Sequence, residues 1–235
     1  MALMSDRVLI QIPFSHNCVK VRVALALKGL PYETHDIAPT NRADVIARSG
    51  QGLVPVLLSD GSVIEDSTAI VMFLESRHPE PALIPADPRA RADCLVLEDW
   101  ADQAFMALSR RISYANVLRR PGALGALFFP HDSAPVRWAK ERIAERVVAK
   151  RFRIVPARHP KDVAEAKRLA RIANARLGGR PWLMGERPTI ADVALAAMSA
   201  PLVADPECRS DPDVGALLAW GEALVPADVS AIYRG

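Results

Sequence analysis

The first 77 residues of the chain alternate between two spacings of hydrophobic side chains. Val8 to Ile12 forms a short apolar run, which predicts a buried strand that ends at Pro13. From Cys18 to Lys28 apolar side chains recur at the spacing of a helix, and Gly29 is a natural stop for it. Tyr32 to Ile37 predicts a second strand. The chain therefore opens as strand, helix and strand.

The pattern continues as a helix, a hairpin and another helix. Asn41 to Arg48 predicts a short helix that its first residue can cap. Val54 to Leu58 and Ser62 to Glu65 predict two strands, because Asp60-Gly61 between them is a strong hairpin signal. Ser67 to Arg77 is rich in apolar residues and predicts a helix. This order of elements is that of a small α/β domain.

A proline-rich segment separates this domain from the rest of the chain. Prolines between residues 79 and 88 stiffen the segment, which predicts an extended connector and a domain boundary. Beyond Arg89 the hydrophobic spacing is helical, with further prolines as interruptions, and no strand is predicted. We therefore expect an α/β domain over residues 1–80, a linker over 81–88 and an all-helical domain over 89–235.

One helix start in the second domain stands out. Thr189 can accept a backbone N–H one turn further on, while the Asp192 carboxylate can reach back and also complement the helix dipole. The residues from Val193 to Ala200 are apolar on nearly every side. We expect this segment to be the buried central helix of the domain, with a structural role.

The composition is that of a soluble globular protein, with 50% hydrophobic and 24% charged residues. The longest nearly apolar stretch, from Val193 to Ala204, is too short to span a bilayer, and the first residues do not have the pattern of a secretion signal. Cys18, Cys94 and Cys208 are odd in number and far apart, which predicts reduced thiols in a cytoplasmic protein. The five histidines show no metal-ligand spacing, so we expect no metal site.

The net charge of +3 is unevenly distributed. Between Arg137 and Arg180, 14 Lys or Arg residues stand against 4 Asp or Glu residues. Such a stretch is compatible with binding to nucleic acid or an acidic membrane, and also with amphipathic helices whose basic faces are solvated. We favour the second interpretation, because no nucleic-acid motif or aromatic platform accompanies the charge. We therefore expect neither nucleic acid nor a membrane as a partner.

Four segments carry a resemblance to a known family. Val21 to Glu33 looks like a first helix and second strand, Gly52 to Leu57 like a glycine-x-Val-Pro-x-Leu turn, and Glu65 to Ile70 like an acid-Ser-x-Ala-Ile segment. Together with the capping box from Thr189 to Asp192, they resemble the glutathione S-transferases over nearly the whole chain. The resemblance implies a thioredoxin-like N-terminal domain, an all-α C-terminal domain and a homodimer, with glutathione as cosubstrate and no tightly bound cofactor.

The resemblance also implies a glutathione site on the first domain. In the family the proline matching Pro55 is cis, which leaves the N–H and C=O of Val54 free to pair with the cysteine part of glutathione like an added strand. Asp66 can pair with the α-ammonium group, and the Ser67 hydroxyl and N–H can bind the α-carboxylate. Both residues would also cap the helix. Gln51 or a residue elsewhere must hold the glycine carboxylate.

Ser15 is the residue that we expect to activate the thiol, because it lies at the position of the first cysteine in glutaredoxin-like relatives. Lowering a thiol pKa from about 8.5 by about two units requires roughly 2.7 kcal/mol. A helix terminus supplies up to about 2 kcal/mol and a hydrogen bond to a charged group about 1.5–3 kcal/mol, so the two together suffice. Cys18, about one turn into the helix, and His16 are competing candidates, and Ser15 alternatively serves only as an N-cap.

The function that follows from the resemblance is that of a cytoplasmic glutathione transferase. The glutathione thiolate attacks a small hydrophobic electrophile, while the protein supplies control of the thiol pKa, orientation and an apolar pocket. We expect the electrophile to lie against the helical domain near five side chains: Trp100, Phe105, Met106, Ser109 and Tyr114.

Two other functions remain open. One is another glutathione-dependent enzyme, either an isomerase of the maleylacetoacetate or maleylpyruvate type or a thiol reductase that works through Cys18. Asn17 stands where zeta-like enzymes carry a cysteine, which argues against the isomerase. The other is a non-enzymatic glutathione-binding protein that uses the basic Arg137–Arg180 stretch to contact an acidic partner.

Overall fold

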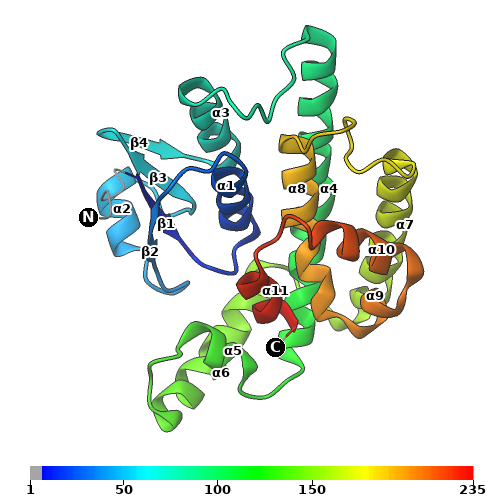
Figure 1. The fold of residues 1–235 in the computed structure, drawn as a ribbon. Helices are drawn as coiled ribbons and strands as arrows, with labels where there is room; N and C mark the ends of the chain where they lie inside the picture. The colour runs from blue at the N-terminus through cyan, green and yellow to red at the C-terminus, as the bar shows by residue number, and fades with distance from the viewer. Residues whose placement is uncertain (1–6, 235) are drawn as a thin grey trace.

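The computed structural model describes residues 7–234, which divide into an α/β part and a helical part (Figure 1). The elements of the α/β part are β1 (Arg7–Gln11), α1 (His16–Leu27), β2 (Glu33–Asp36), α2 (Ala43–Ser49), β3 (Val56–Ser59), β4 (Ser62–Glu65) and α3 (Ser67–Arg77). Those of the helical part are α4 (Pro88–Leu118), α5 (Ala123–Phe128), α6 (Ala134–Arg151), η1 (Pro156–Arg158), α7 (His159–Leu177), α8 (Ile190–Ser199), η2 (Ala200–Ala204), α9 (Pro206–Ser210), α10 (Pro212–Gly221) and α11 (Ala227–Arg234). This arrangement confirms the predicted fold class, a thioredoxin-like domain followed by an all-helical one.

The strands form one mixed sheet in the order β2-β1-β3-β4. β1 runs parallel to β2 and antiparallel to β3, and β3 and β4 form a hairpin. The hairpin turns at Asp60 and Gly61, whose φ angles of 51° and 75° suit a two-residue turn with left-handed central residues. The turn places Ser59 opposite Ser62 and so fixes the register of the hairpin.

Helices cover both faces of the sheet, with α1 and α3 on one side and α2 on the other (Figure 1). Leu9 of β1 packs into the first core, whereas its neighbour Ile10 packs into the second with Val45 of α2. This alternation follows from the two-residue period of a strand. The other buried side chains of the first core are Val21, Leu25, Leu57, Ile70 and Leu74.

α8 is the central helix of the helical domain, and all of its residues are buried. Thr189 and Asp192 form the predicted capping box at its start. The Asp192 carboxylate accepts hydrogen bonds from the Thr189 N–H at 2.8 Å, the Thr189 hydroxyl at 2.8 Å and the Leu183 N–H at 2.7 Å. Asp192 therefore joins the preceding loop to the helix, which is the structural role that the sequence predicts.

The two domains meet at a buried ion cluster around Lys20 of α1. The ammonium group of Lys20 is fully buried and donates to the Asp102 carboxylate at 2.8 Å and to the Thr68 hydroxyl at 3.0 Å. It also donates to Glu98, which in addition accepts from the Thr68 hydroxyl at 2.6 Å. Glu98 and Asp102 belong to α4 and Thr68 belongs to α3, so one cation connects three helices of the two domains.

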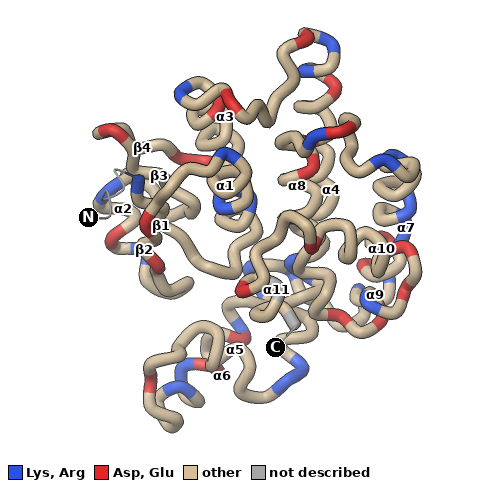
Figure 2. The backbone as a smooth tube through the Cα atoms, in the orientation of Figure 1, with Lys and Arg blue, Asp and Glu red and all other residues tan. Residues whose placement is uncertain are grey.

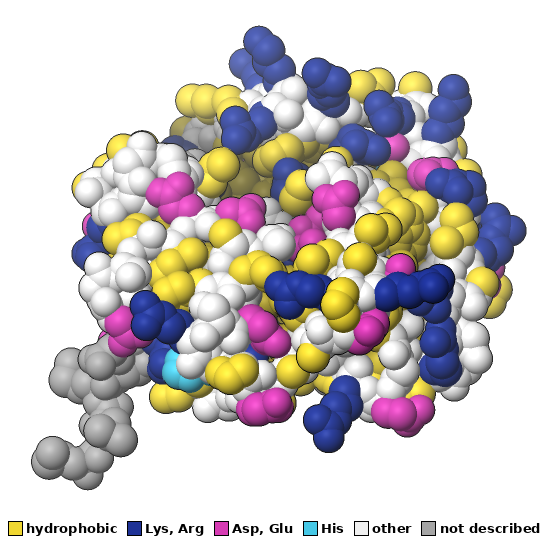
Figure 3. Space-filling model, turned by 90° about the horizontal axis from the view of Figure 1, so that it is seen from above, with side chains coloured by type: hydrophobic (Ala, Val, Ile, Leu, Met, Phe, Trp, Pro, Cys, Tyr) yellow, Lys and Arg dark blue, Asp and Glu magenta, His cyan; other side chains and the backbone are white. Residues whose placement is uncertain are grey.

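The basic stretch Arg137–Arg180 is divided between α6 and α7, which lie at separate ends of the helical domain (Figure 2). Part of its charge is paired, as between Lys167 and Glu207 at 2.8 Å. On the face seen in Figure 3, basic side chains are interspersed with acidic and hydrophobic ones. This distribution favours solvated helix faces over a continuous basic surface. In the described part of the chain, no helix has the length and hydropathy needed to cross a membrane.

Replacing Lys20 with methionine should lower the free energy of unfolding by about 3–5 kcal/mol at neutral pH, because the buried carboxylate of Glu98 and the half-buried carboxylate of Asp102 lose their counter-ion. Urea denaturation followed by circular dichroism measures the loss. Lys167→Met removes an exposed ion pair and is the control, with a midpoint close to that of the parent protein. Equal midpoints for the two variants would show that the Lys20 cluster adds nothing to stability.

Candidate functional site

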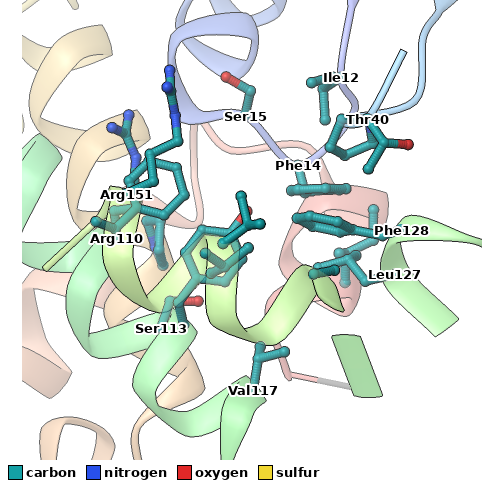
Figure 4. A pocket seen from close by; sticks show the side chains of 18 of the residues that line it. Ile12, Phe14, Ser15, Thr40, Arg110, Ser113, Val117, Leu127, Phe128 and Arg151 are labelled. Carbon is teal, nitrogen blue, oxygen red and sulfur yellow. The ribbon is translucent and has the colours of Figure 1, made fainter. Parts of the chain in front are cut away.

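A large cavity, with a volume of about 740 Å³, lies between the two domains (Figure 4). The first domain contributes the loop between β1 and α1, the loop before α2 and the turn before β3. The second contributes α4, the segment from α5 to α6, and α11. The cavity thus borders the N-terminal end of α1, where the sequence predicts the thiol site. Of the predicted site residues, it is lined by Ser15, His16, Val54 and Tyr114.

Ser15 is the N-cap residue of α1 and lines the cavity. Its hydroxyl makes no capping hydrogen bond, and backbone hydrogen bonds hold the turn. The Ser15 N–H donates to the Ile12 carbonyl at 2.9 Å, and the Ser15 carbonyl accepts from the Val19 N–H at 2.8 Å. This geometry does not match the alternative in which the side chain serves only as a cap. Figure 4 shows Ser15 at the edge of the cavity, where a hydroxyl beside a helix start can donate to an anion.

Cys18 lies further into α1 and is fully buried. Burial raises the pKa of the Cys18 thiol to about 11, although hydrogen bonds from the Ile12 backbone and the Ser15 side chain oppose the rise. A thiol in this state is protonated at neutral pH and inert. The structure therefore gives Cys18 the environment of an inert core thiol, whereas Ser15 lines the cavity.

His16 is the first residue of α1 and is also buried. Burial, reinforced by the positive charge of Arg110, lowers the pKa of His16 to about 3, so the imidazole is neutral at physiological pH. Arg110 Nη2 lies 3.0 Å from His16 Nε2. Because a guanidinium can only donate, this ring nitrogen is the acceptor. His16 therefore holds Arg110 through Nε2, and that atom has no proton to offer a thiolate.

The peptide bond between Val54 and Pro55 is cis. Val54 lies just before β3 and lines the cavity. Among the described residues, no hydrogen bond uses the backbone N–H or C=O of Val54. An unpaired edge of this kind can bind an extended peptide as an added strand. Ser15 and Val54 thus border one cavity, and the described chain leaves the backbone polar groups of Val54 unused.

Asp66 and Ser67 stand at the start of α3 and do not line the cavity. One oxygen of the Asp66 carboxylate accepts from the backbone N–H groups of Thr68 at 2.9 Å and Ala69 at 3.1 Å, so Asp66 caps the helix. Its φ angle of 69° is uncommon for a residue other than glycine, and such strained positions cluster at ligand-binding sites. Asp66 is exposed, whereas Ser67 is buried beside it.

The side-chain amide of Gln51 already forms hydrogen bonds within its own loop. The Gln51 side chain donates to the Leu53 carbonyl at 3.2 Å and accepts from the Leu53 N–H, so it braces the loop. Arg42, which the sequence did not single out, lines the cavity instead. Its Nη1 atom is buried and has no hydrogen-bond partner among residues 7–234. Burial lowers the pKa of Arg42, as expected for a cation without a counter-ion. Arg42 is therefore better placed than Gln51 to bind an anion.

Four of the five residues expected at the electrophile site do not line the cavity, which corrects that part of the sequence prediction. Phe105 and Ser109 are fully buried in the helical core. Trp100 packs edge-on against Phe105 with ring centroids 5.6 Å apart, and Met106 packs against the same core. Tyr114 alone of these five lines the cavity. The cavity face of α4 lies nearer its C-terminal end, at Arg110, Ser113, Tyr114 and Val117.

A row of aromatic rings forms the apolar wall of the cavity. Phe14 stacks on Phe128 with ring centroids 6.3 Å apart, and Tyr114 meets the Phe128 ring edge-on at 6.3 Å. Tyr114 also stacks on Phe152 at 5.2 Å. Burial raises the pKa of Tyr114 to about 12, so its hydroxyl stays protonated. Only Tyr114 of these four was predicted at the site, because the others come from loops and helix ends without a helical pattern of their own.

The helix α11 borders the cavity and holds the loop that precedes Ser15. The Tyr233 hydroxyl donates to the Phe14 carbonyl at 2.6 Å. Arg22 of α1 pairs with Asp228 of α11 at 2.8 Å. The C-terminal helix is therefore tied to both the loop and the helix that carry the candidate thiol site.

Known proteins resemble this chain in both sequence and fold. Residues 9–82 match the family model described as the glutathione S-transferase N-terminal domain. A maleylacetoacetate isomerase of Pseudomonas aeruginosa is 28% identical over 93% of this chain and 88% of its own length. The maleylacetoacetate isomerase of Rattus norvegicus is 30% identical over 87% of this chain and 94% of its own length. The structure of the beta-etherase LigF from Sphingobium aligns with a TM-score of 0.68 and 20% identity, covering 97% of this chain and 99% of that one.

The free energy of unfolding should fall as the pH is lowered from about 6.5 towards 4, because the unfolded chain protonates His16 and the folded protein does not. With a folded pKa of about 3, the loss approaches about 1.4 kcal/mol per pH unit in this window. His16→Gln should flatten the curve there, whereas His131→Gln changes an exposed histidine and should not. Urea denaturation at several pH values measures the slopes, and equal slopes in all three proteins would contradict a neutral His16.

Cys18 should resist alkylation in the folded protein, because its thiol is buried with a pKa of about 11. At mildly alkaline pH, iodoacetamide should modify it at least about 100-fold more slowly than in the urea-unfolded chain. Mass spectrometry of the tryptic peptide that contains Cys18 gives both rates. Comparable rates would restore Cys18 as a candidate nucleophile.

Proposed function

Because the chain belongs to the glutathione S-transferase family, we propose that it is a glutathione transferase that presents the glutathione thiolate to an electrophile in the interdomain cavity. The C–S bond forms at the electrophilic carbon, the leaving group departs with its electron pair, and the thiol proton goes to solvent. The observation that carries the proposal is that the Ser15 side chain and the unpaired backbone of Val54 border the same cavity.

Ser15 stabilises the thiolate in this proposal. A hydrogen bond from its hydroxyl to a charged sulfur contributes about 1.5–3 kcal/mol, and the start of α1 adds up to about 2 kcal/mol. Their sum exceeds the roughly 2.7 kcal/mol needed to lower a thiol pKa by about two units. Support comes from the Ser15 side chain, which makes no capping bond and hydrogen-bonds the Cys18 sulfur, and from Cys18 itself, which is buried and protonated.

The rest of glutathione extends along the first domain on both sides of its cysteine. Val54 pairs with the cysteine backbone beside the cis-proline Pro55. The exposed carboxylate of Asp66 takes the α-ammonium group, while the Ser67 hydroxyl and the start of α3 take the α-carboxylate. Arg42 takes the glycine carboxylate, because its buried Nη1 atom lacks a partner in the described structure.

The electrophile lies against the aromatic wall, most of which belongs to the helical domain, with Tyr114 as its predicted member. No tightly bound cofactor takes part in the proposed reaction. The assembly is a homodimer in the cytoplasm, as for the family that the chain resembles. Three free and buried cysteines suit a reducing compartment of this kind.

A glutathione-dependent isomerase is the second candidate, because two relatives that span most of the chain are maleylacetoacetate isomerases. In that reaction the thiolate adds to a cis-unsaturated diacid, the adduct rotates about the resulting single bond, and the thiolate leaves again. The same Ser15 and Val54 would serve it. Conversion of maleylacetone to fumarylacetone at a rate above that of chloride displacement from an aryl halide would favour this candidate.

Replacing Ser15 with alanine should reduce kcat/KM at neutral pH by about 10- to 100-fold, because the thiolate loses a hydrogen bond worth about 1.5–3 kcal/mol. The pH–rate profile with 1-chloro-2,4-dinitrobenzene should move up by about one to two units. Ser15→Thr keeps a hydroxyl and should stay close to the parent protein.

Ser113→Ala is the matched control, since it removes another hydroxyl from the cavity, on α4. The dissociation constant for glutathione, measured by calorimetry, should change less than about threefold in Ser15→Ala, because the other contacts remain. A pH–rate profile that is identical in Ser15→Ala and the parent protein would exclude Ser15 from thiol activation.

A further inference from the structure

The charged side chains that line the cavity are all basic among the described residues. Among the residues that the structure describes, its lining contains four arginines and a lysine, and neither Asp nor Glu. Lys140 pairs outside the cavity lining with Asp132 at 2.8 Å. By contrast, Arg42, Arg110 and Arg151 form no ion pair with any residue of the described chain. Three guanidinium groups therefore face one cavity without a counter-ion.

Two of these cations gather at the same ring. The Arg110 guanidinium carbon lies 5.1 Å from the Phe152 centroid, and that of Arg151 lies 5.9 Å from it. Arg110 also donates to His16, but that imidazole is neutral and supplies no charge. Burial lowers the pKa of Arg110. A ring face offsets only part of the cost of removing two like charges from water.

The other side of the cavity is apolar. Figure 4 shows Arg110 and Arg151 on one side, and Phe14, Leu127 and Phe128 on the other, with Ser15 between them at the upper edge. The cavity therefore has a pair of arginines on one side and an apolar surface on the other, where the Lys140 ammonium lies 5.4 Å from the Phe129 ring centroid, and Ser15 lies between the two sides.

Side chains of α6 extend the apolar surface. Ile143 and Val147 line the cavity, although 66% and 57% of their surfaces are exposed. Apolar side chains that stay exposed inside a cavity mark a surface that an apolar ligand covers. Because α6 also carries Arg151, the same helix offers both the apolar contact and the charge.

We propose that the electrophile is an amphipathic anion, whose carboxylate binds Arg110 and Arg151 and whose aryl or extended apolar body packs between Phe14, Phe128 and α6. A planar carboxylate can accept hydrogen bonds from two guanidinium groups, which are the side chains best suited to it. This inference rests on the proposed function, because it names the substrate class of the same site. It differs from the small diacid of the isomerase relatives, since the apolar side requires a body without charge.

A matched pair of electrophiles tests the inference. 4-Chloro-3,5-dinitrobenzoate and its neutral carboxamide carry the same reacting carbon, and kcat/KM for each is divided by its uncatalysed rate constant with glutathione to remove electronic differences. The parent protein should prefer the carboxylate by about tenfold or more, as one charge-assisted pair requires. Arg110→Gln and Arg151→Gln should each reduce this preference by about fivefold or more, without raising the KM for glutathione.

Arg146→Gln is the control variant, because it removes an exposed arginine of α6 that does not line the cavity, and it should keep the parent preference. No preference in the parent protein, or a preference that survives in both cavity variants, would overturn the inference. A rise in the KM for glutathione that is equal for both electrophiles would also overturn it, since the arginines would then serve the tripeptide.

Calorimetry separates this inference from the proposed function. Unreactive 3,5-dinitrobenzoate should bind the parent protein at least about tenfold more tightly than 3,5-dinitrobenzamide, and Arg151→Gln should abolish the difference. If the parent protein conjugates neither electrophile but shows this difference, the transferase proposal fails and the anion site stands. If it conjugates both electrophiles equally and binds both analogues equally, the transferase stands and the anion site fails.

Discussion

The buried ammonium of Lys20 is the constraint on which the geometry of the site depends. It ties α1 to Glu98 and Asp102 of α4 and to Thr68 of α3. α1 begins next to Ser15 and α3 begins at Ser67, so this cluster links the helices that carry both of these residues to the second domain. A charged cluster resists sliding more than an apolar contact does, because each of its hydrogen bonds has a fixed direction.

Once the two domains are fixed, each supplies a different kind of surface to the cavity. The first domain offers polar backbone and a hydroxyl, at Val54 and Ser15, which suit a peptide and its sulfur. The second offers aromatic rings and guanidinium groups from α4, α6 and the loops around them. The first surface depends on strand and helix ends that the fold dictates, whereas the second depends on side chains that leave the fold unchanged when they vary. In the proposed function, the side chains of the helical domain would therefore select the electrophile.

The sequence predicted candidate residues at positions that local structure determines. Ser15, Val54 and Asp66 each stand at a helix start or a strand end, and such boundaries follow from the hydrophobic pattern and a few turn residues. Phe105 and Ser109 were misplaced because the pattern of a helix that is 31 residues long does not tell which apolar face meets the core. Arg42 was missed for a different reason. Arg42 is a candidate because its buried Nη1 atom has no hydrogen-bond partner in the described structure. That depends on tertiary packing and not on the spacing of residues along the sequence.

The contact between Tyr233 and the Phe14 carbonyl joins two positions that are 219 residues apart in the sequence. During synthesis on the ribosome, the loop ahead of Ser15 emerges long before the helix that holds it. The α/β domain can thus complete its sheet before the Phe14 carbonyl gains its hydrogen bond from Tyr233. A nascent chain of this protein would therefore form its sheet before it completes the contacts around Ser15.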